Sequence, residues 1–225
     1  AKRAVYAWSE RLAGRFCDGV ICVKNSDGAS AVGLLGLPTE RVHVFPNAVD
    51  TRRFQPLDSA ARADVRSKVF GVARSTAVVG MVGRLAEQKN PLCFVRTAHA
   101  VLQRGLDAAF FLIGDGELRG NVEAEIARLG CTGRITVLGW RPDVPELLGA
   151  LDLFVLPSRW EGLSLAILEA MACGVPVVAS DIPGNRDAVV EGVDGWLAAP
   201  DNPASTAAAA VALLESESMR KEFGA

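Results

Sequence analysis

The chain has 225 residues, of which half are hydrophobic and 22% are charged, and its formal net charge at pH 7 is −2. This length and composition suit a globular protein with one large hydrophobic core, or with one core and a smaller fragment. The balanced charge excludes the basic footprint of a nucleic-acid-binding protein, and no apolar run is long enough to span a membrane.

Five cysteines are scattered along the chain without a Cys-x-x-Cys pair: Cys17, Cys22, Cys93, Cys131 and Cys173. An odd number of cysteines without metal-ligand spacing predicts reduced thiols and a cytoplasmic protein. The two histidines, His43 and His99, lie in apolar or helical contexts, and we expect both to be structural.

The first part of the chain predicts a short piece of α/β structure. Apolar residues recur at helical spacing over 2–15, which favours an ordinary packed helix over a helix on a membrane surface. A strand, a helix and a second strand are expected at 19–23, 26–35 and 41–45. Turn residues then predict a linker over 46–56. Because the helical pattern is already present at the first residues, we expect a longer parent protein.

From residue 58 onward, helices and strands alternate. The expected strands are 77–82, 109–113, 135–138, 151–156, 175–178 and 195–197. The expected helices are 58–70, 91–104, 117–129, 144–150, 185–190 and one from about 203, with a further helix after Ser164. This alternation predicts an α/β fold with a doubly wound, mostly parallel sheet that helices cover on both faces. Ligands of such sheets bind outside the carboxyl ends of the strands.

The loop after strand 77–82 carries two cations. Arg84 and Lys89 flank a segment that leads into a helix with Pro91 in its first turn. A helix start with cations beside it suits a diphosphate. Cations in a solvated loop are the alternative, which the residues alone favour.

The loop after strand 109–113 is rich in glycine. Gly114 and Gly116 are followed by Gly120, which departs from the Gly-x-Gly-x-x-Gly pattern of dinucleotide-binding proteins. The next strand ends in Gly139, Trp140 and Arg141, without the acid that would bind a ribose. A nicotinamide-dependent enzyme is therefore disfavoured.

The most informative stretch runs from Trp160 to Pro176. A buried strand is followed by the tight turn Glu161-Gly162-Leu163-Ser164, and we expect the side chain of Ser164 to cap the next helix. Gly174 suits the left-handed position after that helix. A helix start favours an anion such as phosphate, and Gly162 lets a ligand approach the backbone closely.

Two acids, Glu161 and Glu169, border this turn and helix. Their spacing corresponds to about 12 Å if helical, wider than the roughly 5 to 9.5 Å of glycoside-hydrolase pairs, although side chains can close part of the gap. The spacing fits two acids at opposite ends of a long anionic ligand. The neighbours of Glu169 are apolar nearly all round, which predicts a buried helix in which Glu169 needs a partner. Two ordinary surface glutamates are an equally weighted reading.

At this point the sequence resembles a known family. Glu161 and Glu169 match the Glu-x7-Glu motif of retaining glycosyltransferases with the two-domain GT-B fold, most closely glycosyltransferase family 4, and the flanking residues from Pro157 to Val178 match as well. The segment 46–50 is similar to the family's Pro-Asn-Gly-Val-Asp linker, with Ala48 in place of the glycine.

The resemblance implies a fold and a domain division. Residues 56–225 would be the Rossmann-like donor domain, which binds a nucleotide-diphosphate sugar and lacks its final crossover helix. Residues 1–55 would be the remnant of an N-terminal acceptor domain and the linker. The family's chemistry then implies a retaining transfer of a sugar to a glycan or lipid-linked acceptor, as in polysaccharide and lipopolysaccharide biosynthesis.

The resemblance also implies the site residues. Glu161, Arg84 and Lys89 would be catalytic, Glu169 would bind the ribose, and the remaining donor contacts would be Gly83, Gly114, Gly116, Gly139, Arg141, Gly162, Leu163 and Ser164. There is no Asp-x-Asp motif, so we expect no metal and no cofactor. The donor would be a UDP- or GDP-sugar, and the whole protein would be cytoplasmic, with peripheral contact to the inner face of the membrane as one option.

Two rival functions stay open at this stage. A nucleotide-sugar epimerase of related fold would use the same donor without an acceptor, and a non-catalytic module would only bind the nucleotide sugar. For the chain by itself we expect weak donor binding and no transfer.

Overall fold

A computed structural model of the protein describes residues 2–224. The chain divides into two compact units, residues 1–48 and residues 49–225. The first and last residues of the expected domains, 1 and 225, lie outside the described part. Among the described residues, no helix has both the length and the apolarity needed to cross a bilayer.

The smaller unit has one pair of parallel strands. Its elements are α1 (Lys2–Gly14), β1 (Val20–Cys22), α2 (Asn25–Gly33), η1 (Thr39–Arg41) and β2 (Val42–Val44), which confirms the expected order. β1 pairs with β2 in parallel, with Val20 opposite Val42. Its small core consists of Cys22, Ala31 and Leu37.

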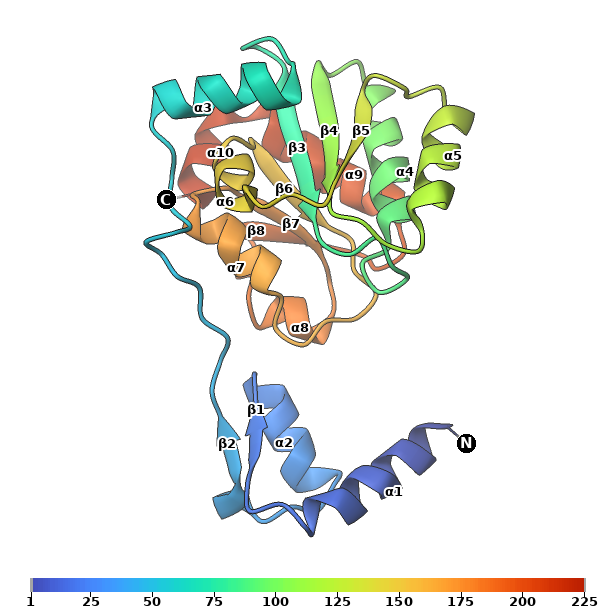
Figure 1. Ribbon diagram of the computed structural model, residues 1–225, viewed down its shortest axis with the longest axis vertical. Coiled ribbons are helices and arrows are strands. Elements are labelled where there is room, and N and C mark those ends of the chain that lie inside the picture. The colour runs from blue at the N-terminus through green and yellow to red at the C-terminus, as the bar shows by residue number, and fades with distance from the viewer. Residues whose placement is uncertain (1, 225) are drawn as a thin grey trace. The chain divides into compact units, whose positions relative to one another are not determined.

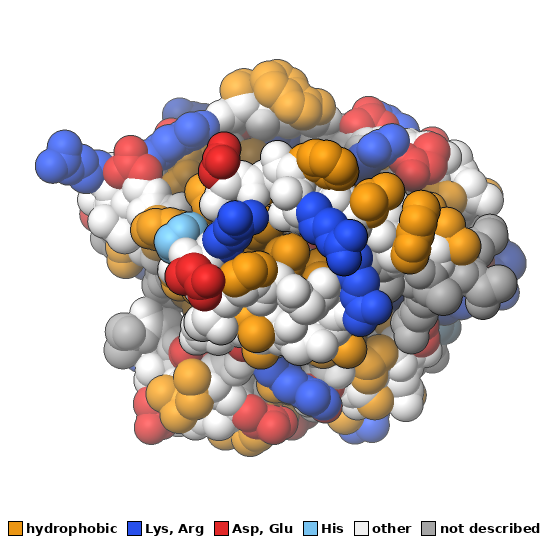
Figure 2. All heavy atoms as spheres, turned by 90° about the horizontal axis from the view of Figure 1, so that it is seen from below, with side chains coloured by type: hydrophobic (Ala, Val, Ile, Leu, Met, Phe, Trp, Pro, Cys, Tyr) orange, Lys and Arg blue, Asp and Glu red, His pale blue; other side chains and the backbone are white. Residues whose placement is uncertain are grey.

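Many large hydrophobic side chains of the smaller unit are exposed: Val5, Tyr6, Trp8, Leu12, Phe16, Ile21, Leu34 and Phe45. The space-filling view in Figure 2 shows hydrophobic side chains, in orange, at several places on one face of the molecule. Two short strands bury little on their own. The smaller unit therefore leaves a large share of its apolar residues in contact with solvent.

The larger unit is built on one parallel sheet of six strands. The strands are β3 (Ala77–Val82), β4 (Ala108–Ile113), β5 (Ile135–Gly139), β6 (Leu153–Leu156), β7 (Val177–Ser180) and β8 (Gly195–Ala198), in the order β5-β4-β3-β6-β7-β8. Figure 1 shows the twisted sheet between its helices. All six expected strands are confirmed. β7 begins later than expected because the N–H of Val175 still donates to Ala170 at the end of the preceding helix.

The sheet is covered by helices on both faces. They are α3 (Ser59–Val65) with the π-helical turn η2 (Arg66–Phe70), α4 (Pro91–Leu102), α5 (Arg119–Arg128), α6 (Val144–Gly149), α7 (Leu165–Ala172), α8 (Pro183–Arg186), α9 (Pro203–Glu215) and α10 (Glu217–Phe223). α4, α5 and α9 lie on one face, and α6 and α7 lie on the other (Figure 1). Helix α4 packs on the sheet through Phe94, whose ring lies edge-on against Phe110 of β4 with the ring centroids 6.1 Å apart. The doubly wound α/β fold is confirmed.

The boundaries of α8 differ from the expected helix at 185–190. Pro183 occupies the first turn, where its fixed φ suits a helix, so α8 begins earlier. The helix also ends earlier, at Arg186, and the N–H of Val190 donates to Asp194 Oδ1.

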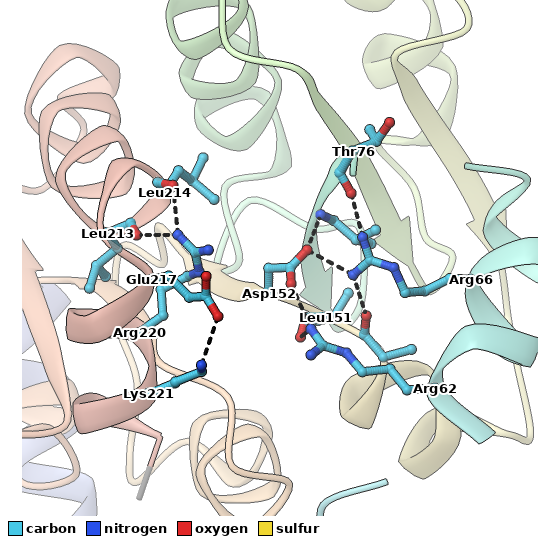
Figure 3. A network of polar contacts seen from close by, with 12 residues as sticks. Arg62, Arg66, Thr76, Leu151, Asp152, Leu213, Leu214, Glu217, Arg220 and Lys221 are labelled. Carbon is cyan, nitrogen blue, oxygen red and sulfur yellow. Dashed lines mark hydrogen bonds and ion pairs between the residues drawn. The ribbon is translucent and has the colours of Figure 1, made fainter. Parts of the chain in front are cut away.

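At the amino edge of the sheet, a group of ion pairs holds α3 and η2 in place (Figure 3). Asp152, just before β6, accepts hydrogen bonds from Arg62 at 2.6 Å and from Arg66 at 2.8 Å. Its second carboxylate oxygen also accepts from the N–H of Val78 in β3, at 2.6 Å. One carboxylate thus joins two turns of helix to two neighbouring strands.

Candidate functional site

The carboxyl edge of the sheet has a topological switch point between β3 and β6. The chain builds β4 and β5 outward on one side of β3, and then returns to build β6, β7 and β8 on the other side. The loops after β3 and after β6 therefore leave the sheet in opposite directions. Doubly wound sheets bind their ligands in the crevice that this divergence creates.

An ion pair between the two loops lies at the switch point. Lys89, from the loop after β3, and Glu161, from the loop after β6, have their Nζ and Oε1 atoms 2.6 Å apart. The side chain of Glu161 is 6% exposed and that of Lys89 is 17% exposed. Gly83 lies against the Lys89 side chain, since a Cβ added to Gly83 would be 3.4 Å from Lys89 Cε. The structure thus brings Gly83, Lys89 and Glu161 together, and their contacts with a donor stay a prediction.

The same carboxylate has a second close partner that the sequence analysis missed. Ser158 Oγ donates to Glu161 Oε1 at 2.7 Å, and Ser158 is completely buried. Gln88, next to Lys89, donates from Nε2 to the carbonyl oxygen of Trp160 at 3.1 Å. Ser158 belongs to the motif that carried the resemblance, but a motif does not tell which of its polar side chains turn inward.

Arg84 does not join Lys89. Its side chain is 74% exposed, and its Nε donates to Glu117 at 3.1 Å. The next residue, Leu85, is buried and its backbone is held by Asp115 and Leu118, which turns Arg84 toward solvent. A role for Arg84 at the diphosphate stays a prediction and requires its side chain to leave Glu117.

The expected cap on α7 is absent. Ser164 takes the extended backbone conformation of an N-cap residue, yet its hydroxyl makes no hydrogen bond to the helix. Ser164 is 3% exposed, and within residues 2–224 its Oγ has no hydrogen-bond partner. A buried hydroxyl without a partner is costly, so this atom is suited to meet an oxygen of a bound ligand at the helix start.

α7 is only partly buried, so the expectation of a helix that is buried nearly all round is wrong. Ile167 and Ala170 face the core, whereas Leu165 is 46% exposed. Glu169 is half-buried, and burial raises the pKa of its carboxyl group above the usual value, while the positive charges of Arg53 and Lys89 act in the opposite direction. No described side chain or N–H group donates a hydrogen bond to this carboxylate.

Arg53 is a second residue that the sequence analysis missed. It lies in the segment before α3, with its guanidinium 5.5 Å from the centroid of the Phe54 ring. Its positive charge acts on the pKa of Glu169, which is far from it in the sequence. A basic residue in a turn does not by itself indicate which distant acid it influences.

The glycine-rich loop after β4 packs tightly on the loop after β3. A Cβ on Gly114 would be 2.0 Å from the carbonyl oxygen of Gly83, and one on Gly116 would be 2.6 Å from that of Leu85. The N–H of Gly114 donates to the carbonyl oxygen of Gly139, which has a positive φ of 72°. Close approach of backbones therefore explains the glycines at 114 and 116, and a positive φ favours glycine at 83 and 139. The contact of these four residues with a donor stays a prediction.

Arg141, in the loop after β5, is paired within its own loop. Its guanidinium donates to both carboxylate oxygens of Asp143, which raises the pKa of Arg141 and lowers that of Asp143. A cavity of about 270 Å³ opens beside this pair, lined by Arg53, Pro142, Asp143, Pro145 and Glu146.

The turn between the two acids rests on α8. Gly162 is exposed and Leu163 is half-buried. A Cβ on Gly184 of α8 would be 2.1 Å from the carbonyl oxygen of Gly162 and 2.4 Å from that of Glu161. Within the part of the chain that the structure describes, no group of three or more His, Cys, Asp or Glu side chains is arranged to hold a metal ion.

Comparisons with known proteins agree with this geometry. The family model "Glycosyl transferases group 1" matches residues 76–216. A galactosyltransferase from Escherichia coli, UDP-Gal:alpha-D-GlcNAc-diphosphoundecaprenol alpha-1,3-galactosyltransferase, is 38% identical over 198 residues, which cover 87% of this chain and 51% of the relative. The chain thus spans about half the length of the curated relatives it matches.

Two solved structures are similar to the chain. Anabaena Alr3699/HepE, crystallised with UDP and glucose, superposes with a TM-score of 0.85 at 28% identity over 95% of this chain and 58% of that one. The C-terminal domain of the group 1 glycosyl transferase LpcC from Francisella tularensis has a TM-score of 0.69 at 24% identity, which shows the fold, over 79% of this chain and 93% of that one. The chain belongs to the group 1 glycosyltransferases, family 4, and covers mainly the C-terminal domain of their GT-B fold.

Proposed function

We propose that the switch point of the larger unit binds a nucleotide-diphosphate sugar, and that the whole protein is a retaining glycosyltransferase. The observation that carries the proposal is the buried Lys89–Glu161 pair beside the unpartnered hydroxyl of Ser164 at the start of α7. A cation, a helix start and a free hydroxyl suit a diphosphate, and two separate acids suit the hydroxyl groups of a sugar and a ribose.

Each residue then has a distinct role. Lys89 and the start of α7 stabilise the diphosphate as it takes the electron pair of the breaking glycosidic bond. Glu161 lies beside the sugar, where its negative charge stabilises the positive charge that develops at the anomeric carbon. Glu169 accepts hydrogen bonds from the ribose hydroxyl groups. The acceptor hydroxyl oxygen forms the new bond to the anomeric carbon, and its proton passes to the oxygen of the departing diphosphate on the same face.

The name of the E. coli relative and the ligands of HepE favour a UDP-sugar over a GDP-sugar as donor. The smaller unit is proposed to be the end of the acceptor domain, and its exposed hydrophobic side chains support this because they require cover. The acceptor is then a glycan or a lipid-linked sugar, held mainly by residues of the N-terminal domain.

Isothermal titration of the chain with UDP-, GDP- and ADP-sugars tests the donor site. We expect binding of a UDP-sugar, weakened about tenfold by Ser164→Ala and by Lys89→Ala, since each removes a hydrogen bond to a charged group. Lys68→Ala, on an exposed ion pair remote from the switch point, is the control and leaves the affinity unchanged. Absence of binding for all three nucleotide sugars would overturn the proposal.

The transferase activity is tested on the intact protein, with the anomeric configuration of the product determined by NMR. Retention of the donor's configuration is expected. The 225-residue chain alone is expected to bind donor and to transfer nothing, so transfer by this chain would contradict the placement of the acceptor site in the N-terminal domain.

A further inference from the structure

A chain of buried hydrogen bonds ends on the carboxylate of Glu161. Asn185 Nδ2 donates to the carbonyl oxygen of Ser180 at 2.9 Å and to its hydroxyl oxygen at 3.2 Å. The Ser180 hydroxyl donates to the carbonyl oxygen of Ser158, and the Ser158 hydroxyl donates to Glu161 Oε1. The three donors come from α8, from the end of β7 and from the loop after β6.

The direction of these hydrogen bonds is determined by their chemistry. The amide nitrogen of Asn185 can only donate hydrogen bonds, so the Ser180 hydroxyl oxygen accepts one from it. The Ser180 hydroxyl in turn donates its own hydrogen bond to the carbonyl oxygen of Ser158. The carboxylate of Glu161, when ionised, can only accept, so the Ser158 hydroxyl must donate to it. Every donor along the chain therefore points toward Glu161.

Burial makes the chain difficult to replace with water. Ser158 and Asn185 are 0% exposed and Ser180 is 2% exposed. Removal of the Ser180 hydroxyl takes the side-chain donor from the buried carbonyl oxygen of Ser158, and such a loss costs more in the interior than at the surface. The chain thus restricts the position of Ser158 and, through its hydroxyl, one oxygen of Glu161.

A second contact holds the same turn. Gly184, the neighbour of Asn185, lies so close to the carbonyl oxygens of Glu161 and Gly162 that no side chain fits there. α8 is therefore placed against the backbone of Glu161 by one residue and linked to its side chain by the next.

We propose that Ser158, Ser180 and Asn185 are positioning residues of the transfer reaction. They orient the Glu161 carboxylate so that Oε1 stays on Lys89 while the group faces the sugar of the donor. The inference rests on the proposed function of the site, and it adds that a short helix outside the Glu-x7-Glu motif determines how well Glu161 performs its role. Preorganised charge accelerates a reaction because no reorganisation is needed at the transition state.

The test compares Ser158→Ala, Ser180→Ala and the double variant in the intact protein. Ser158→Ala is expected to lower kcat about tenfold, the effect of one hydrogen bond to a charged group, and Ser180→Ala about threefold. The KM for the donor and the affinity for UDP, which lacks the sugar, are expected to change by less than about twofold. The double variant should lose no more in kcat than Ser158→Ala, because Ser180 acts through the Ser158 hydroxyl.

Thr206→Val is the control for a purely structural effect. Thr206 is 2% exposed, and its hydroxyl donates to the carbonyl oxygen of Asn202, the N-cap residue of α9. This variant should lower the unfolding temperature about as much as Ser180→Ala while kcat is unchanged. If the serine variants lower the unfolding temperature alone, or if their effects on kcat multiply in the double variant, the positioning role is refuted.

If the proposed function is wrong, the intact protein without substitutions transfers no sugar, which is a different result from those above. The positioning role is then decided by a crystal structure of Ser158→Ala. A carboxylate that has moved away from Lys89 Nζ supports the role, and a carboxylate that keeps its 2.6 Å contact contradicts it.

Discussion

The Lys89–Glu161 pair shows how two buried charges depend on each other. Each side chain is largely removed from solvent, and neither could be held there as a lone ion at low cost. Each charge of the pair therefore depends on the other. Because Lys89 lies in the loop after β3 and Glu161 in the loop after β6, the pair also joins two loops that are far apart in the sequence.

Replacement of one partner should expose this dependence. Lys89→Met is expected to lower the free energy of unfolding by about 3 kcal/mol, because Glu161 becomes a buried charge without its cation. Addition of Glu161→Gln should restore most of that loss without restoring donor affinity. Urea unfolding and titration with a UDP-sugar measure the two effects, and a double variant as unstable as Lys89→Met would contradict the coupling.

Glu169 leads to a prediction on pH. Burial raises the pKa of its carboxyl in the folded protein, so the folded state binds the proton more tightly than the unfolded chain does. The stability that this group contributes is present at pH values below the ordinary pKa of glutamate and is lost as the pH rises through the raised pKa. The free energy of unfolding relative to Glu169→Gln is therefore expected to fall as the pH rises from the ordinary pKa of glutamate through the raised pKa of the folded protein.

The same residue should make donor binding depend on pH. Ribose hydroxyl groups donate to the charged carboxylate, which lowers its pKa in the complex. The affinity for UDP-glucose is expected to rise with pH through the raised pKa of Glu169, and calorimetry in two buffers should detect the released proton. A Glu169→Gln variant with the same pH profile would rule out this explanation.

At this scale, the sequence predicted the residues that lie within one motif or next to one strand end. Gly83, Lys89 and Glu161 were identified and come together in the structure. Ser158, Ser180, Asn185 and Arg53 were not, because their contacts depend on which side chain turns inward and on pairs of residues far apart in the sequence. The cap by Ser164 was wrong for the same reason, since hydroxyl orientation is a property of the packed structure.

At the scale of elements, the loops after β3, β4 and β5 are packed on each other through their backbones. Gly114 has a φ of 141° and no room for a Cβ beside Gly83. Gly114→Ala is expected to lower the free energy of unfolding by at least about 3 kcal/mol, because it adds a clash with backbone to a strained dihedral angle.

Gly120 provides a matched control in the same region. It lies in α5, has nothing within 4 Å of an added Cβ, and has no positive φ. Gly120→Ala is expected to raise the free energy of unfolding by about 0.5 kcal/mol through its better helix propensity. Chemical denaturation of both variants gives the comparison, and a mild effect at Gly114 would show that the loops can separate.

Elements of this fold differ in how readily their sequence predicts them. The central strands are apolar runs buried on both faces, such as β4, where every residue is buried. All six strands of the larger sheet were located to within about two residues. α8 was misplaced because its start depends on Pro183, and because Val190, which periodicity assigned to the helix, bonds to the side chain of Asp194. α7 was expected to be buried nearly all round, because a run of apolar residues does not show which face of a helix stays exposed.

At the scale of the whole molecule, the two edges of the larger sheet have different roles. The amino edge is closed by Asp152 with Arg62 and Arg66, and the carboxyl edge carries the candidate donor site. Asp152→Ala is expected to cost about 3 to 5 kcal/mol, since it leaves the buried guanidinium of Arg66 without its carboxylate.

Asp64→Ala tests whether this cost is specific. Asp64 pairs with Lys68 on the exposed side of the same helical segment, and the change is expected to stay within about 0.5 kcal/mol. Donor affinity measured well below the unfolding temperature should be unchanged in both variants, because the substitutions lie at the opposite edge from the switch point. A loss of affinity in Asp152→Ala would show that the edges are coupled.

The strand order determines when the two halves of the candidate donor site are both present during synthesis. β3 pairs with β4, which follows it directly, but its other neighbour is β6, which the ribosome delivers much later. β3, β4 and β5 can pair with segments that are near in the sequence. Lys89, in contrast, pairs with Glu161 only after the long loop between β3 and β6 has closed. A nascent chain that ends before β6 contains Lys89 but not Glu161, so the proposed donor site can form only after β6 has joined β3 and before the outer strands β7 and β8 complete the sheet.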